Sequence, residues 1–246
     1  MTAAPAPAVV RAMSMPAAPT AQVSFPQTSP LVIRLADGFR DELGAALAAI
    51  PYPEHGYRDT LARIRDLHHR MAPCLPALTR NADLSRAMPA APCAIKLVNL
   101  PQSASLPMPP QGGGRLKRID KPDYVSETLL LLISCFFGTP YTMACEGLGL
   151  VNNLIPAQST SNQLTGLGAD SDLRFHIENA ALRFLTGADC SPKALLLRGL
   201  RQDARPPHTR LSDARLAPSL LEPETVDALT AAHFRLRLPY RWRTWR

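Results

Sequence analysis

Apolar residues recur at helical spacing in the first third of the chain. Residues 40–50 and 57–71 each place leucine or isoleucine every three or four positions, which predicts two amphipathic helices. Pro51 ends the first of them. Residues 72–92 have no sustained period, so we expect a connecting loop with short helical pieces. The longest apolar run, residues 129–137, follows Ser126-Glu127-Thr128 and predicts a buried helix that the sequence Gly-Thr-Pro closes.

The second half of the chain is patterned differently. Strands are expected over residues 94–100, 147–155, 173–179, 194–200 and 234–238, with one helix over 222–232 between the last two. A loop rich in Pro, Gly and Ser follows the first strand, and a polar loop covers 159–172. Helices followed by strands indicate an α+β protein with a β-barrel or jelly-roll core.

The N-terminal segment is of another kind. Residues 1–30 are rich in Ala, Pro, Ser and Thr and have no hydrophobic period, so we expect them to be disordered. Residues 31–246 then form one domain. The chain has 246 residues and 46% hydrophobic content, which suffices for one sizeable core.

Composition narrows the class of protein. No apolar run reaches the roughly 18 residues of a membrane span, and the N-terminus lacks a basic start followed by a long apolar stretch. The five cysteines are scattered and form no CxxC pair. They indicate reduced thiols of a cytoplasmic protein, not a disulfide framework or a zinc site.

The formal net charge of +7 raises the question of nucleic-acid binding. Arginines are spread along the chain, and the densest group, residues 235–246, is interleaved with Tyr240, Trp242 and Trp245. Such interleaving is also typical of single-stranded nucleic-acid sites. The alternative is an exposed, arginine-rich chain end, and the weak patterning favours it.

One short motif carries candidate chemistry. His176 and Glu178 lie two positions apart in an expected strand, where alternate residues point to the same face. They can therefore offer an imidazole and a carboxylate to one metal ion. With a distant second histidine they make the facial triad of non-haem iron(II) oxygenases. The motif alone is weak, because such triplets arise by chance, and a surface pair on a half-buried strand is the alternative.

The segments around this motif follow a recognisable order. They are Ala94–Pro101 (AIKLVNLP), the proline-rich 106–110, Ser126–Pro140, Leu150–Pro156 (LVNNLIP), Gln163-Leu164-Thr165, Phe175–Ala180 (FHIENA), Ala194–Asp203 and Phe234–Trp242. In this order they resemble the clavaminate synthase-like family of iron(II)- and 2-oxoglutarate-dependent oxygenases. The resemblance covers roughly residues 90–242.

The resemblance implies a double-stranded β-helix (jelly-roll) core behind N-terminal helices. It also implies that His176 and Glu178 bind iron(II), that Thr209 assists 2-oxoglutarate, and that Gln163 and Thr165 contact the substrate. The reaction would be hydroxylation of a free amino acid or derivative, or its cyclisation or desaturation, with oxygen as co-substrate. The setting would be specialised-metabolite, antibiotic-type biosynthesis. A carboxylate ligand also argues against a halogenase, which needs that position for halide.

Three features depart from the family pattern. The stretch 181–193 differs in sequence and length, and Cys145 and Glu146 stand where the family often has a glutamine near the substrate. The chain also ends 68 residues after Glu178. The family's second iron histidine and its 2-oxoglutarate arginine lie further on, so we expect a truncated fold without them.

The missing ligand leaves alternatives open. His233, ten residues before Arg243, and His208 are the remaining candidates for a third ligand; a capping or surface histidine is the other interpretation. A catalytically inactive homologue or a binding protein is therefore the main rival to an active oxygenase, and a nucleic-acid binder is the lesser one.

Overall fold

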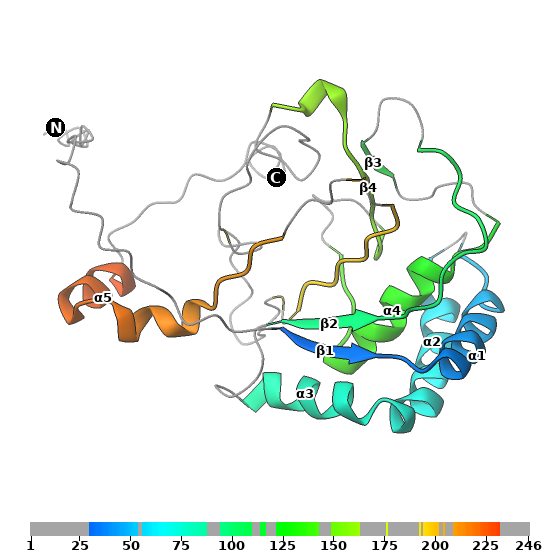
Figure 1. Cartoon of the computed structure of the whole chain (residues 1–246), viewed down its shortest axis with the longest axis horizontal. Coiled ribbons are helices and arrows are strands. Elements are labelled where there is room, and N and C mark those ends of the chain that lie inside the picture. The colour runs from blue at the N-terminus through cyan, green and yellow to red at the C-terminus, as the bar shows by residue number, and fades with distance from the viewer. Residues whose placement is uncertain are drawn as a thin grey trace, which may run out of the picture.

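The structure is a computed structural model of the whole chain (Figure 1). It describes residues 30–53, 56–87, 94–109, 114–116, 122–142, 149–162, 176, 192, 194–201, 204 and 209–231. Apart from Pro30, the segment expected to be disordered lies outside the described residues. These residues form helices and two separate two-stranded sheets.

The first sheet is a parallel pair. Strand β1 (Leu31–Arg34) pairs with β2 (Ile95–Val98), in register from Leu31 opposite Ile95. Parallel strands need a long crossover connection. Here the helices between the two strands supply it (Figure 1). Strand β2 confirms the prediction for 94–100, whereas β1 was not predicted.

The described part of the crossover holds three α-helices and the short 3-10 helix η1 (Ala72–Cys74). Helices α1 (Asp37–Ala48) and α2 (Arg58–Met71) confirm the two amphipathic helices expected there. The prediction of a loop over 72–92 was wrong in part, because α3 (Pro76–Ala87) is a regular helix of 12 residues. Proline is tolerated in the first turn, where its missing N–H has no helical partner. Leu78 and Ala82, one turn apart, are each 1% exposed and anchor α3 in the core.

Helix α4 (Val125–Phe137) is the centre of the packing. It contacts α1, α2 and α3, and residues on nearly all of its sides are buried. A helix that is apolar all round belongs inside the core. At its start, Asp123 Oδ1 accepts hydrogen bonds from Val125 N at 3.1 Å and from Ser103 Oγ at 2.5 Å. Asp123 thereby fixes the loop after β2 to the beginning of α4.

The second sheet is antiparallel. Strand β3 (Gly114–Leu116) pairs with β4 (Asn153–Ile155), so of the described residues of the strand expected over 147–155, which are 149–155, the last three are paired. Residues 194–200 were expected to form a strand and are not part of one. Arginine side chains anchor this segment instead: Arg198 donates to Pro101 O, and Arg201 donates to Leu106 O and Pro107 O.

A last helical region stands apart from the others (Figure 1). The 3-10 helix η4 (Ala214–Leu220) leads into α5 (Pro223–Thr230), which confirms the helix predicted over 222–232. None of the residues of α5 is buried. The expected strands 173–179, except for His176, and 234–238 lie outside the described residues. The jelly-roll core stays a prediction for that reason.

Within the described part of the chain, the helices are too short or too polar to cross a bilayer.

One titratable group lies against the core. On α2, the ring of His68 meets Phe136 of α4 edge to face, with ring centroids 4.4 Å apart. Its Nε2 atom is closed to solvent and has no hydrogen-bond partner. Burial lowers the pKa of His68, and the neighbouring His69 lowers it further. The folded protein therefore resists protonation of this ring.

Replacing His68 by methionine should weaken the pH dependence of stability. Below the ordinary histidine pKa of about 6.5, the unfolded chain takes up a proton that the folded chain resists. The free energy of unfolding should therefore fall between about pH 7 and pH 5 in the wild type, and fall less in His68→Met. Urea unfolding across this range measures the difference. His69→Met, one position along the same helix and exposed, should keep most of the wild-type slope, because burial is the larger cause of the lowered pKa of His68 and remains in that variant. A slope in His68→Met equal to that of the wild type would contradict the assignment.

Candidate functional site

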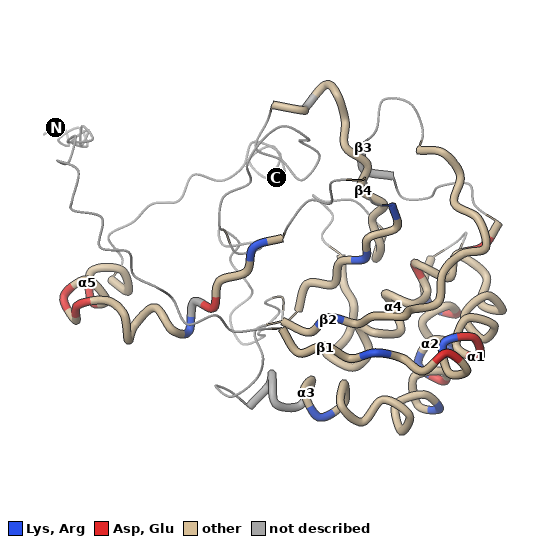
Figure 2. The backbone as a smooth tube through the Cα atoms, in the orientation of Figure 1, with Lys and Arg blue, Asp and Glu red and all other residues tan. Residues whose placement is uncertain are grey.

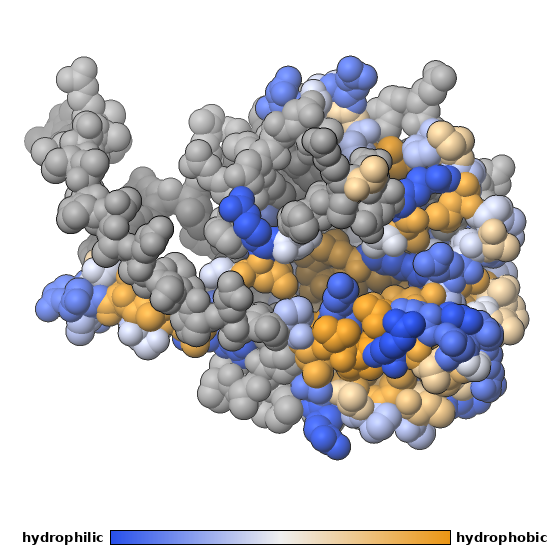
Figure 3. Space-filling model, viewed as in Figure 1, coloured by the Kyte–Doolittle hydropathy of each residue, from blue (hydrophilic) through white to orange (hydrophobic). Residues whose placement is uncertain are grey.

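A cavity of about 410 Å³ lies between α4, β4, the loop after β2 and the arginine-anchored segment. Its volume falls within the range of small-molecule sites. Figure 3 shows hydrophobic residues gathered in a hollow on this face of the molecule. The lining residues are Leu106, Pro107, Pro109, Ser126, Glu127, Leu130, Val151 to Pro156 and Leu196 to Arg201. Most of them are apolar, so the few polar groups determine what the cavity can recognise.

The first polar group comes from the start of α4. Glu127 is 2% exposed and is the one charged residue of a helix whose other residues are apolar or carry hydroxyl groups. Burying a carboxylate is costly unless it is hydrogen-bonded or paired. Asn153 of β4 meets that need in part, because its Nδ2 donates to Glu127 Oε1 at 3.3 Å. The bond also ties α4 to β4 across the cavity wall.

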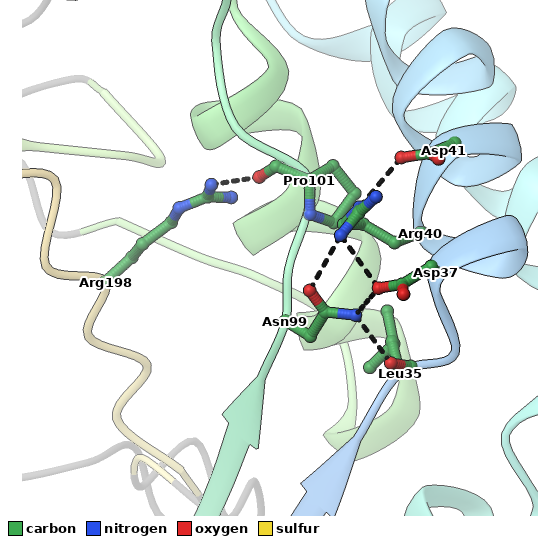
Figure 4. A network of polar contacts seen from close by, with 7 residues as sticks. All are labelled: Leu35, Asp37, Arg40, Asp41, Asn99, Pro101 and Arg198. Carbon is green, nitrogen blue, oxygen red and sulfur yellow. Dashed lines mark hydrogen bonds and ion pairs between the residues drawn. The ribbon is translucent and has the colours of Figure 1, made fainter.

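The second polar group is Arg198. Its Nη2 donates to Pro101 O, as Figure 4 shows, and holds the segment against the end of β2. Burial lowers the pKa of Arg198, while the carboxylates of Glu127 and Asp123 act in the opposite direction. A guanidinium keeps its proton over the whole physiological range. Arg198 therefore places a cation in the cavity wall within electrostatic range of two carboxylates, of which Glu127 also lines the cavity.

Two donors beside this cavity have nothing to bond to. Ser126 Oγ and Arg198 Nη1 are closed to solvent and have no hydrogen-bond partner. Buried polar atoms in folded proteins nearly always have a partner, so each exception needs a physical explanation. Both atoms belong to residues that line the same cavity.

A second, more open depression of about 520 Å³ lies on the other side of Pro101. Its polar groups satisfy one another (Figure 4). Asn99 Nδ2 donates to Leu35 O and to Asp37 Oδ1, both at 2.8 Å, and Arg40 donates to Asn99 Oδ1 at 2.9 Å. Asn99 has φ of 60°, a conformation that asparagine tolerates better than most residues. We interpret this network as the structural junction between β2 and α1.

The structure describes only two of the residues that the sequence predicts for the site. His176 and Thr209 are described, have exposed side chains, and do not line the cavity. The other candidates, which are Glu178, Gln163, Thr165, Cys145, Glu146, His208 and His233, lie outside the described residues. In the portion that is described, no three His, Cys, Asp or Glu side chains come together as a metal site. The described residues alone do not make up an iron site.

Sequence reasoning assigned no role to the polar residues that line the cavity. Ser126, Glu127 and Arg198 lie in segments noted for their family resemblance, but only as parts of a helix and a strand. A signal was present, because Glu127 and Arg198 are charges set in the apolar runs SETLLLL and LLLRGL. A charge inside a buried run needs a partner, and partners of buried charges cluster. Asn153 had no comparable signal.

In the view of Figure 2, the lysines and arginines of the described residues do not gather on one face. Arginines are interspersed with acidic residues along α1 and α2. The arginine-rich residues 235–246, which were the basis of the nucleic-acid alternative, lie outside the described residues.

Comparison of the chain with protein families, with curated protein sequences and with solved structures found no significant match.

Proposed function

We propose that the protein binds a small molecule in the cavity beside α4, and that it is an iron(II)- and 2-oxoglutarate-dependent oxygenase acting on an amino-acid-type substrate. One observation carries the proposal. The loop 106–109, helix α4, the stretch 151–156 and the segment 196–201 all border one cavity. These are four of the segments on which the family resemblance rests, and they are far apart in the sequence.

The character of the cavity supports the small-molecule part. Its walls are largely leucine, valine and proline, and its polar groups are few and come from three different segments. Convergent polar groups in an apolar hollow are typical of ligand sites. The motif His176-Ile177-Glu178 supports the iron part through its spacing.

A second candidate function is a binding protein without iron chemistry. The exposed side chain of His176, which does not line the cavity, favours it. In that case the cavity would still bind its ligand, but no oxygen-dependent reaction would follow.

Anaerobic titration of the purified chain with iron(II) and 2-oxoglutarate separates the two candidates. An active site of the proposed kind should give a weak visible absorption band that His176→Ala and Glu178→Ala each abolish. His69→Ala, an exposed histidine on α2, should keep the band. Absence of the band in the wild type would refute the oxygenase and leave the binding protein.

A further inference from the structure

The cavity offers hydrogen-bond donors more than acceptors. Ser126 Oγ and Arg198 Nη1 both lack a partner, whereas the amide of Asn153 already bonds to Glu127. A serine hydroxyl can donate one hydrogen bond, and a guanidinium can only donate. The group that satisfies both atoms is therefore an acceptor oxygen.

Because the two donors are buried, their hydrogen bonds to such an acceptor are strong. Ser126 is 4% exposed, and water does not reach the two unpartnered atoms. Hydrogen bonds from a charged donor to a charged acceptor are short and about twice as strong as neutral ones. Because the two donor atoms are closed to solvent, their hydrogen bonds are also less screened than bonds at the surface.

Charge balance permits one negative group. Arg198 faces Glu127 and Asp123, and Arg201 at the rim adds a second positive charge. The formal charges of these four groups sum to zero, so one bound carboxylate would bring the net charge to minus one. A second carboxylate would add another negative charge and would have no unpartnered donor to bind. The remaining wall, with Leu130, Val151 and Leu196, favours an apolar body.

We infer that Ser126 and Arg198 bind the carboxylate of a small monocarboxylic acid whose apolar body lies against the leucine-rich wall of the cavity. The inference rests on the proposed small-molecule cavity and does not depend on iron chemistry. Glu127 is then a positioning residue, which orients Arg198 by charge and is itself held by Asn153.

Calorimetric titration of the full chain with three probes of similar shape tests the ligand class. The probes are 4-methylpentanoate, its neutral amide 4-methylpentanamide, and the cation 3-methylbutylamine. We expect the carboxylate to bind at least tenfold more tightly than the other two. Equal or tighter binding of the amide or the amine, or no binding of the carboxylate, would overturn the inference.

Two variants test the residues. Ser126→Ala should weaken carboxylate binding about tenfold, the scale of one hydrogen bond to a charged group. Arg198→Lys keeps the positive charge but lacks the second nitrogen, so it should also weaken binding about tenfold. Binding of the amide should weaken less in either variant, because its neutral carbonyl oxygen accepts weaker hydrogen bonds from the same donors than a carboxylate does.

Matched controls guard against indirect effects. Ser219→Ala on η4 and Arg63→Lys on α2 are exposed substitutions outside the cavity and should keep wild-type affinity. Ser126→Ala should fold at least as well as the wild type, since it removes a buried hydroxyl that has no partner. Wild-type carboxylate affinity in both cavity variants would refute the assignment of these donors.

Failure of this inference and failure of the proposed enzyme give different results. Carboxylate binding without the iron(II) absorption band would keep the inference and refute the oxygenase. The band without carboxylate binding would keep the oxygenase and refute the inference.

Discussion

Leu132→Ala is expected to lower the free energy of unfolding by about 3 to 5 kcal/mol. Leu132 is 0% exposed and lies on α4, the helix that contacts α1, α2 and α3. Truncating it removes apolar contacts and leaves a cavity among three helices that cannot all relax into the space. Urea unfolding followed by circular dichroism measures the change.

The matched control is Leu229→Ala on α5. Leu229 is 57% exposed, and the same truncation there should change stability by less than about 0.5 kcal/mol. A loss in Leu132→Ala no larger than in the control would contradict the central place of α4. Leu132 does not line the cavity, although α4 also carries Ser126 and Glu127. Leu132→Ala should therefore weaken ligand binding only in conditions where the protein begins to unfold.

The helices were predictable where one apolar face repeats over several turns. Residues 40–50 and 57–71 have that pattern, whereas the helix expected over 126–137 was marked by a continuous apolar run; α1, α2 and α4 begin and end within a few residues of the prediction. Helix α3 was missed because, among its residues whose burial is described, the buried ones are Leu78 and Ala82, and alanine is a weak hydrophobic signal. Its place in the core is decided by packing, which a local pattern does not contain.

The strands were harder to predict for a related reason. Strand β1 has four residues and is defined by a partner more than sixty positions away. Residues 194–200 have the apolar composition of a strand, and Leu196 and Leu200 are half-buried while Leu195 and Leu197 are exposed. That alternation fits the prediction, yet the described segment is fixed by arginine side chains bonded to carbonyl oxygens. Pairing depends on which segment lies alongside, and the sequence of one segment does not specify that.

Part of the candidate site could likewise be predicted from the sequence, and part of it could not. The spacing of His176 and Glu178 can be read from the sequence, because alternate residues of a strand share a face. The convergence of Ser126, Asn153 and Arg198 on one cavity cannot, because these residues come from segments that only the fold brings together.

Arg198→Met is expected to destabilise the protein by about 2 to 4 kcal/mol. Removing Arg198 from this partly buried group of charges takes its positive charge away from the carboxylates of Glu127 and Asp123, and Glu127 at 2% exposure has little access to water. The hydrogen bond to Pro101 O is lost as well, which frees the segment from the end of β2. Arg201→Met, three positions along the same segment, should cost at most about 1 kcal/mol, because Arg201 is exposed and its bonds to the loop carbonyls can be replaced by water.

The double variant Glu127→Gln/Arg198→Met identifies the cause of the loss. Glutamine keeps the side-chain oxygen that accepts from Asn153 but carries no charge. If the uncompensated carboxylate is what destabilises Arg198→Met, then Glu127→Gln should restore about 1 to 2 kcal/mol in that background, and chemical unfolding of the four proteins of the cycle measures the coupling. Strictly additive losses would mean that Arg198 acts through packing and its bond to Pro101 alone. Glu127 would then not orient Arg198 by charge, and the ligand's carboxylate would depend on Ser126 and Arg198 without it.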